Sequence, residues 1–189
     1  MKLLIRGGSI AAGYGVVKNY ADILKESLLK KEIEVINRSR YRENSFDGTG
    51  TFNKDIYHFA PDILLIHFVI DDAFDYVYRS EFQENIVQII RLARFRFNPF
   101  IFLATAHTFD NPHDMDAVNI FYRSLRIVAS DLECELIPVH SYWAGYLEEH
   151  NLCNKDLVQS DSRYPNEHGH EIIAEAMIKR LSKLFIMKQ

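Results

Sequence analysis

Short apolar runs alternate with longer amphipathic stretches along this chain, and the two patterns predict different elements. The apolar runs predict five strands, at Leu3–Ile5, Glu34–Asn37, Ile63–Ile66, Phe100–Ala104 and Leu136–Val139. The run Ile63–Ile66 is apolar at every position, which is typical of a strand that is covered on both faces of a sheet.

The stretches between these runs carry apolar residues at a spacing near 3.6, which predicts helices. They are residues 17–31, residues 81–97, the segment after Met115 that carries Val118 to Val128, and the C-terminal segment from about Asn166. Strands that alternate with helices predict a parallel sheet with right-handed crossovers, in a three-layer α/β/α sandwich. The length of 189 residues fits a single domain, residues 1–189.

Ligands of such a sandwich bind beyond the carboxyl ends of the strands. The segments that leave those ends are therefore the places to look for chemistry. They are residues 7–15, 37–45, 69–74 and 107–116, together with the approach to the last helix at 160–170.

Composition narrows the classes of function. With 22 basic and 26 acidic residues the net charge is −4, so we expect neither nucleic acid nor a membrane surface as a partner. No apolar run approaches the roughly 18 residues of a membrane helix, and the run before Arg6 is too short for a signal peptide. Two cysteines, Cys134 and Cys153, are too few for a disulfide framework. We expect a globular, cytoplasmic protein with reduced thiols.

The turn Gly7-Gly8-Ser9 follows the first predicted strand. A serine in a glycine-flanked turn between a strand and a helix can present its hydroxyl where backbone N–H groups also point, which suits a nucleophile. The alternative is a tight turn with a helix-capping serine. The glycine spacing fits neither the dinucleotide fingerprint nor the phosphate loop, so we expect no nucleotide and no cofactor.

Together with two later segments, this turn resembles the SGNH (GDSL-like) hydrolase family. The segments are residues 61–73, PDILLIHFVIDDA, and residues 161–170, DSRYPNEHGH. The family pattern has a Gly-Asp-Ser turn, a glycine after the second strand, Gly-x-Asn-Asp after the third, and Asp-x-x-His-Pro-Asn-x-x-Gly-His near the end. The resemblance runs from Ser9 to His170, and it implies the flavodoxin-like SGNH fold and an esterase that forms an acyl-serine intermediate.

Three positions match the functional residues of the family. The resemblance implies that Ser9 is the nucleophile, with its N–H in the oxyanion hole. Asp161 stands where the family aspartate orients the catalytic histidine, and Asp72 matches the aspartate that follows the oxyanion asparagine.

Several positions depart from the family pattern. Gly8 stands in place of the aspartate and Val69 in place of a glycine. Asp71 replaces the asparagine that helps to bind the oxyanion, and Tyr164 takes the place of the catalytic histidine. Tyr41 or Arg42 falls near the glycine that follows the second strand.

These departures leave the base that would activate Ser9 undetermined. Tyrosine, with a pKa of about 10, is already protonated at neutral pH and accepts a further proton poorly. A carboxylate at Asp71 offers no donor to an oxyanion unless it is itself protonated. His168 lies four residues after Tyr164, so one helical turn can bring its imidazole to the family position, although a solvated place on that turn is the alternative. His67 and His107 are further candidates, and His170 matches a packing residue of the family.

The loop His107–Asp116 concentrates two histidines and three aspartates. Such side chains suit several divalent ions, but Asp110-Asn111-Pro112 is turn chemistry, and acidic residues favour the start of the next helix. We expect no metal, and we expect His107 to line the rim of the cleft and to contact substrate.

Two groups of aromatic or basic residues can be interpreted either as a binding surface or as a structural feature. The first group forms either a rim that binds an anion or a sugar, or a salt-bridged surface. It consists of Arg38, Arg40, Tyr41, Arg42, Arg163 and Tyr164. The second is Tyr142–Tyr146, which suits stacking on a carbohydrate ring but equally a helix packed under the active-site loops.

Two functions follow. The first is an SGNH-type ester hydrolase that acts on a small ester, such as an O-acetyl group on a carbohydrate, and is thus a deacetylase. The second is a catalytically impaired binding module that keeps the cleft and lacks a base. An imidazole nitrogen within roughly 3–4 Å of the Ser9 hydroxyl would favour the enzyme.

Overall fold

The computed structural model describes residues 1–75 and 77–186, so the last three residues of the predicted domain 1–189 lie outside the described residues. Its strands pair in parallel in the order β2-β1-β3-β4-β5. The strands are β1 (Lys2–Gly7), β2 (Glu34–Asn37), β3 (Ile63–His67), β4 (Phe100–Ala104) and β5 (Glu135–Ile137). The predicted five-stranded parallel sheet is confirmed.

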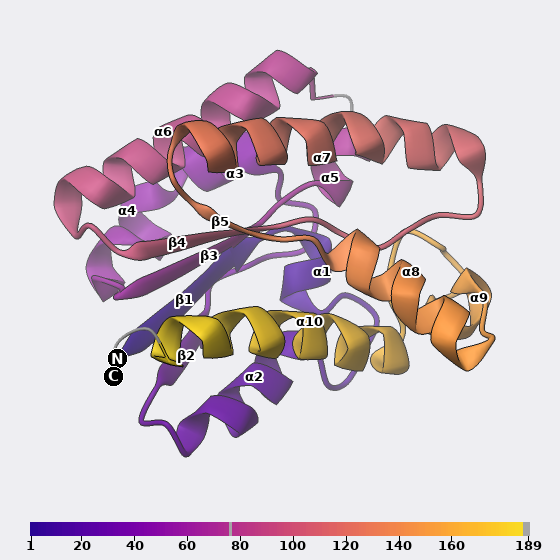
Figure 1. The fold of residues 1–189 in the computed structure, drawn as a ribbon. Coiled ribbons are helices and arrows are strands. Elements are labelled where there is room, and N and C mark those ends of the chain that lie inside the picture. Colours follow the sequence, from indigo (N-terminus) through magenta and orange to yellow (C-terminus); the bar gives the residue numbers. More distant parts are fainter. Residues whose placement is uncertain (76, 187–189) are drawn as a thin grey trace.

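Helices cover both faces of the sheet and complete the predicted α/β/α sandwich (Figure 1). On one face lie α3 (Ser45–Gly50), α6 (Arg79–Arg96) and α7 (Pro112–Asp131). On the other lie α2 (Tyr20–Leu29) and α10 (Glu167–Ile186), with α8 (Val139–His150) packed against α10. The shorter helices are α1 (Ser9–Ala12), α4 (Phe52–Asp55), η1 (Tyr57–Phe59), α5 (Ile70–Phe74) and α9 (Asn154–Leu157).

The central strands are apolar on both sides because helices cover both sides. Leu3, Leu4 and Ile5 of β1 are fully buried, and so is the run Ile63–Ile66 of β3 to within 1%. A parallel sheet with both faces covered requires such continuous apolar runs. The prediction that Ile63–Ile66 is covered on both faces is confirmed.

Most element boundaries differ from the prediction by a few residues, and two of these differences have a local cause. Helix α7 begins at Pro112 and not after Met115, because the Asn111 side chain accepts the His113 N–H and proline suits the first helical position. Strand β5 ends at Ile137 and not at Val139, because Pro138 already caps α8. The residues called turn chemistry in the sequence are thus a helix cap.

The carboxyl ends of β1, β2 and β3 lie next to one another at the same end of the sheet. Gly7 pairs with His67 and Ile5 with Asn37, so the segments that follow these strands leave the sheet as neighbours. Within the described ranges, no helix combines the length and the apolar character that a membrane span requires.

Candidate active site

Two glycines let Ser9 follow β1 closely. A Cβ at Gly7 would lie 2.2 Å from the His67 carbonyl oxygen, and a Cβ at Gly8 would lie 2.1 Å from an Asp71 carboxylate oxygen and 2.4 Å from the Glu43 carbonyl oxygen. Neither position has room for a side chain. The space that an aspartate at position 8 would need is filled by Asp71, so the departures at Gly8 and Asp71 are physically linked.

Asp71 binds Ser9 through both of its carboxylate oxygens. The Ser9 hydroxyl donates to Oδ1 at 2.5 Å and the Ser9 backbone N–H donates to Oδ2 at 2.7 Å. The Arg42 backbone N–H donates to the Ser9 hydroxyl oxygen at 3.0 Å. We call Gly8, Ser9, Arg42 and Asp71 the serine site. Its hydroxyl is held between a carboxylate and a backbone amide.

Both polar side chains of the serine site are buried. Ser9 is 0% exposed and Asp71 is 6% exposed. Burial raises the pKa of Asp71 above the ordinary carboxyl value, although the hydrogen bonds from Ser9 partly oppose this. Asp71 therefore holds a proton more readily than an exposed aspartate does.

Arg42 makes its contact with Ser9 through the backbone, from an unusual conformation. Its φ is +61°, in the left-handed region that favours glycine. That Tyr41 or Arg42 stands near the family glycine after the second strand stays a prediction. The guanidinium of Arg42 lies over the Tyr41 ring, 5.3 Å from its centroid.

A buried charge network fastens the loop that carries Arg42 to β1. Arg6 is fully buried, and its guanidinium donates to Glu43 at 2.5 Å and to the Thr51 hydroxyl at 2.9 Å. Arg40 pairs with Asp55 and Glu43, and Asp55 lies 3.5 Å from Arg6. The salt-bridged alternative holds for Arg38 and Arg40, but the buried centre of the network was not predicted. Its signal was Arg6, a charge near the end of an otherwise apolar strand.

Asp161 and Arg163 form an ion pair in the segment before α10. The guanidinium donates from Nε to Oδ1 at 2.9 Å and from Nη2 to Oδ2 at 2.5 Å. These bonds hold the pKa of Asp161 below its usual range. Asp161 therefore binds a neighbouring cation here, where the family resemblance implied that it orients an imidazole.

Tyr164 lies close to Asp71, which raises the pKa of the tyrosine after the larger effect of its own burial. Among the residues that the structure describes, none is hydrogen-bonded to the Tyr164 hydroxyl. The segment is closed by a bridge between Val158 and Pro165 and by a Gln159 N–H to Tyr164 carbonyl bond of 2.9 Å. Tyr164 is thus a neutral hydrogen-bond donor beside Asp71.

These residues surround a pocket of about 260 Å³. Its lining residues are Tyr14, Tyr41, Arg42, Ile70, Asp71, Phe74, Asp75, Asp161, Arg163 and Tyr164. Tyr14 stacks on Tyr41 with ring centroids 4.0 Å apart, and Tyr164 meets Tyr14 edge-on at 4.8 Å. Asp71 and Arg42 both line the pocket and contact Ser9. The two ends of the chain therefore meet around one pocket, as the sequence predicted.

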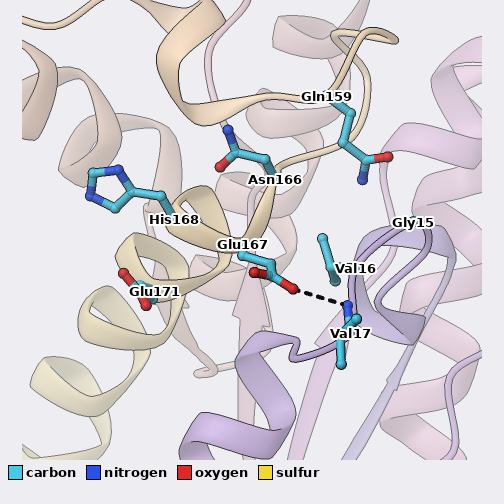
Figure 2. A pocket seen from close by; sticks show the side chains of 8 residues that line it. All are labelled: Gly15, Val16, Val17, Gln159, Asn166, Glu167, His168 and Glu171. Carbon is cyan, nitrogen blue, oxygen red and sulfur yellow. Dashed lines mark hydrogen bonds between the residues drawn. The ribbon is translucent and has the colours of Figure 1, made fainter.

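His168 lies elsewhere, which corrects the expectation that it reaches Ser9. It is exposed, its imidazole is hydrogen-bonded to the Tyr146 hydroxyl at 3.1 Å, and it lines a second pocket with Gly15 and Glu171. Figure 2 shows the His168 imidazole pointing away from Val17 and Glu167. The first turn of α10 directs the side chain toward α8 and not toward Asp71.

His107 does not line the rim of the cleft, contrary to the expectation. It is fully buried, with Nε2 2.9 Å from the Ser162 carbonyl oxygen and its ring against Phe109 and Trp143. Burial lowers its pKa to about 4. His107 therefore supports the segment that precedes Tyr164. Trp143 is buried in α8, so the helical interpretation of residues 142–146 holds for it.

Asp72 is hydrogen-bonded to Ser45 and not to Ser9, and it does not line the pocket, which corrects its expected place among the oxyanion and substrate residues. Its carboxylate accepts the Ser45 N–H at 2.9 Å and joins α5 to the start of α3. Burial raises the pKa of Asp72 to about 7.

His67 and His170 are held by Tyr20. His67 Nδ1 lies 3.0 Å from the Tyr20 hydroxyl, and His170 Nδ1 accepts the Tyr20 N–H at 3.3 Å. Burial, followed by the nearby imidazoles, lowers the pKa of His67 to about 3 and that of His170 to about 4; His107 contributes to both shifts. We call Tyr20, His67, His107 and His170 the histidine cluster. In the described part of the chain, no imidazole is hydrogen-bonded to Ser9, and no group of three or more histidine, cysteine or acidic residues is placed to hold a metal ion.

No family model and no curated protein matches the sequence, but solved structures match the fold. The acetylxylan esterase Axe2 from Geobacillus stearothermophilus has a TM-score of 0.84 at 19% identity, over 95% of this chain and 93% of that chain. LAE5, an alpha/beta hydrolase enzyme from the metagenome of Lake Arreo in Spain, has a TM-score of 0.82 at 18% identity, over 95% and 94% of the two chains.

A protein of the lipolytic G-D-S-L family from Desulfitobacterium hafniense has a TM-score of 0.79 at 19% identity, over 94% of this chain and 98% of that chain. Further Axe2 structures are of catalytic mutants in which a serine, a histidine or an aspartate is replaced by alanine. At this level of identity the likeness concerns the fold. The chain has the SGNH (GDSL-like) hydrolase fold that its motifs predicted.

Proposed function

We propose that the protein is an ester hydrolase in which the Ser9 hydroxyl attacks the ester and forms an acyl-serine intermediate. The observation that carries the proposal is the hydrogen-bonded Ser9 hydroxyl in the turn after β1, at the edge of the sheet where this fold binds ligands. The esterases among the neighbours of this fold support the same chemistry. A serine hydroxyl is a weak nucleophile until a neighbouring base accepts its proton, and the Ser9 hydroxyl already donates to a carboxylate.

The lining of the pocket supports a small ester on a carbohydrate as the substrate. Tyr14, Tyr41 and Tyr164 present aromatic rings, which suit the apolar faces of sugar rings, and Arg42 can bind sugar hydroxyls. The volume of about 260 Å³ admits a small acyl group and part of a sugar. The neighbour Axe2 is an acetylxylan and acetyl-xylooligosaccharide esterase, which makes an O-acetyl group the first substrate to test.

Ser9 has no exposed surface, so productive binding requires a movement at the floor of the pocket. We expect Tyr164 to be the side chain that moves. Its hydroxyl has no hydrogen bond among the described residues, so displacing it breaks none. An entering ester carbonyl would take the place of the tyrosine hydroxyl beside Asp71. The same hydroxyl is then available as a donor to the ester.

The test is acetate release from acetylated xylo-oligosaccharides and hydrolysis of para-nitrophenyl acetate. We expect turnover by the unaltered protein and a fall to the background rate for Ser9→Ala, with thermal melting as the check on folding. Equal rates for the two proteins would remove Ser9 from the mechanism.

The second candidate function is a binding module that no longer hydrolyses. Two observations favour it: Asp71 engages both the hydroxyl and the N–H of Ser9, and no described imidazole contacts the hydroxyl. This candidate predicts that acetylated oligosaccharides bind, as measured by calorimetry, without release of acetate. It also predicts a large gain in esterase rate for Tyr164→His, which would place an imidazole three residues after Asp161.

A further inference from the structure

We propose that Asp71 is the general base for Ser9 and that, once protonated, it donates a hydrogen bond to the oxyanion. This inference rests on the proposed function, and it names the group that removes the proton from the Ser9 hydroxyl. One carboxylate would do the work that a histidine and an asparagine share in the family pattern.

The geometry supports the first half of this proposal. The Ser9 hydroxyl already donates its hydrogen to Asp71 Oδ1 at 2.5 Å, so the proton to be removed points at the proposed base. A general base must lie within hydrogen-bond reach of the proton that it abstracts, and Asp71 is the described ionisable side chain that meets this condition. The second oxygen is fixed by the Ser9 N–H at 2.7 Å, which holds the carboxylate in this orientation.

The backbone is shaped around this contact. A side chain at Gly8 would come within 2.1 Å of Asp71 Oδ2, so a larger residue there would displace the carboxylate from Ser9. The absence of a side chain at position 8 and the presence of a carboxylate at position 71 therefore form one arrangement.

Asp71 and Asp161, which both line the pocket, differ in their charge partners. The Arg163 guanidinium pairs with Asp161 through three hydrogen bonds and lowers the pKa of Asp161, which makes Asp161 a weak base. In the described part of the chain, no arginine or lysine forms a salt bridge with Asp71. Burial and the nearby charge of Asp75 raise the pKa of Asp71, which makes its carboxylate the stronger base.

The reaction balances with Asp71 as the only proton carrier. As Ser9 Oγ forms a bond to the carbonyl carbon, its O–H bond breaks and the proton passes to Asp71 Oδ1. The π electrons of the carbonyl move to its oxygen, and the new Asp71 carboxylic acid donates to that oxyanion. The C–O bond to the alcohol then breaks, and Asp71 returns the proton to the leaving oxygen. Water repeats the sequence on the acyl-serine, and Ser9 recovers its proton.

A protonated carboxyl group resolves the conflict at position 71. A charged carboxylate beside an oxyanion would raise the barrier, whereas a carboxylic acid has an O–H donor in the place where an asparagine has an N–H. Tyr164 supplies a second donor, because the raised pKa keeps its hydroxyl protonated. Tyr164 is for the same reason no rival for the role of base.

The decisive comparison is between Asp71→Asn and the unaltered protein, with kcat and KM measured on para-nitrophenyl acetate. We expect kcat to fall about a hundredfold or more, the usual contribution of a general base, while KM changes little. Asparagine keeps the shape and restores the amide of the family pattern. A rate equal to or above that of the unaltered protein would overturn the proposal, because it would show that the carboxylate obstructs the oxyanion.

A second measurement does not depend on changing Asp71. The kcat of the unaltered protein should fall at acidic pH as Asp71 becomes protonated. Asp75→Asn removes a charge that raises the pKa of Asp71, so this acid limb should move to lower pH, by a fraction of a pH unit. An acid limb that stays in place in Asp75→Asn would contradict the assignment.

The possible results distinguish a failure of the proposed esterase function from a failure of the role assigned to Asp71. If the unaltered protein releases no acetate and hydrolyses no para-nitrophenyl ester, the proposed function fails. If Ser9→Ala is inactive while Asp71→Asn keeps its rate and its acid limb, the function stands and the role of Asp71 fails. Covalent labelling of Ser9 by a para-nitrophenyl phosphonate, followed by mass spectrometry, gives a readout that needs no turnover; we expect slower labelling in Asp71→Asn.

Discussion

The serine site and the histidine cluster lie at the same edge of the sheet and are built from opposite ionisable groups. In the serine site, the Ser9 hydroxyl lies between the buried Asp71 carboxylate and the Arg42 backbone N–H. In the histidine cluster, Tyr20 holds His67 and His170, and His107 lies within electrostatic range of both. The buried serine and the buried imidazoles thus occupy separate places.

Burial acts on the two regions with opposite sign. It raises the pKa of Asp71 and lowers the pKa of His67 to about 3, because it disfavours the charged form of each. An imidazole at that depth is a weaker base than an ordinary aspartate, whose pKa is about 4. The residue type that usually accepts a serine proton is therefore unsuited here, and the carboxylate is better suited than its type suggests.

The largest expected effect concerns the histidine cluster and pH. The pKa values of His67, His107 and His170 are about 3, about 4 and about 4 in the folded protein, below the unfolded value near 6.5. The unfolded chain therefore binds more protons below pH 6.5, so stability is complete above that pH and is lost as the pH falls. We expect the free energy of unfolding to drop by about 5 kcal/mol between pH 6.5 and 4.5, as urea titrations would measure. A flat profile would show that these imidazoles are not buried and neutral.

The second-largest expected effect is the loss of stability on removing Arg6, the buried cation near the serine site. Arg6→Met leaves Glu43 and Asp55 without their buried partner, so we expect a loss of about 3–5 kcal/mol in urea unfolding. Arg38→Met is the matched control, because the Arg38 side chain is 35% exposed and bonds the same Asp55 at 3.3 Å. We expect it to cost less than about 1 kcal/mol. Equal costs would mean that Arg6 is not the centre of the network.

A methyl group at Gly8 tests whether the turn is built around Asp71. Gly8→Ala should cost about 1–3 kcal/mol and abolish the reaction of Ser9, because its Cβ meets the Asp71 carboxylate. Gly145→Ala is the control, since nothing lies within 4 Å of its Cβ in the interior of α8. That substitution should stabilise the protein by about 0.5–1 kcal/mol. Unchanged esterase rates in Gly8→Ala would contradict the close contact.

The smallest expected effect concerns Asp72, whose contribution to stability depends on pH in the opposite direction to that of the histidines. Burial raises the pKa of Asp72 to about 7, so its contribution to stability is present at low pH and is lost as the pH rises from about 4 to about 7. It opposes the histidines over the same range. We expect Asp72→Asn to steepen the acid loss of stability by about 1 kcal/mol per pH unit at most, as paired urea titrations would measure. A shallower profile in the variant would reverse the inferred sign.

The sequence was informative where a pattern has only one physical solution. Apolar runs such as Ile63–Ile66 predict strands that are covered on both faces, and the family motifs predict that Ser9 and Asp161 meet. The pocket confirms that Tyr164, Asp161, Arg42 and Asp71 gather, although their chemical roles stay predictions.

The sequence was uninformative where the outcome depends on the direction of a side chain. His168 has the right spacing from Tyr164, but the first turn of α10 directs it to Tyr146. His107 follows β4 as expected, yet its ring turns inward to Trp143. The bond between Asp71 and Ser9 depends on the space left by Gly8, a coupling between distant positions that no local pattern contains.

The backbone contact of Arg42 has a consequence for how this protein is dissected. Because the amide and not the guanidinium binds the Ser9 hydroxyl, replacing the side chain leaves that interaction intact. An alanine substitution at Arg42 would show no loss of this contact and would report only the strain of the left-handed φ angle. Glycine would relieve that strain and keep the donor, whereas proline, whose ring fixes φ at about −65°, cannot adopt this angle. The contact with Ser9 is therefore one that no substitution tolerated by this backbone removes.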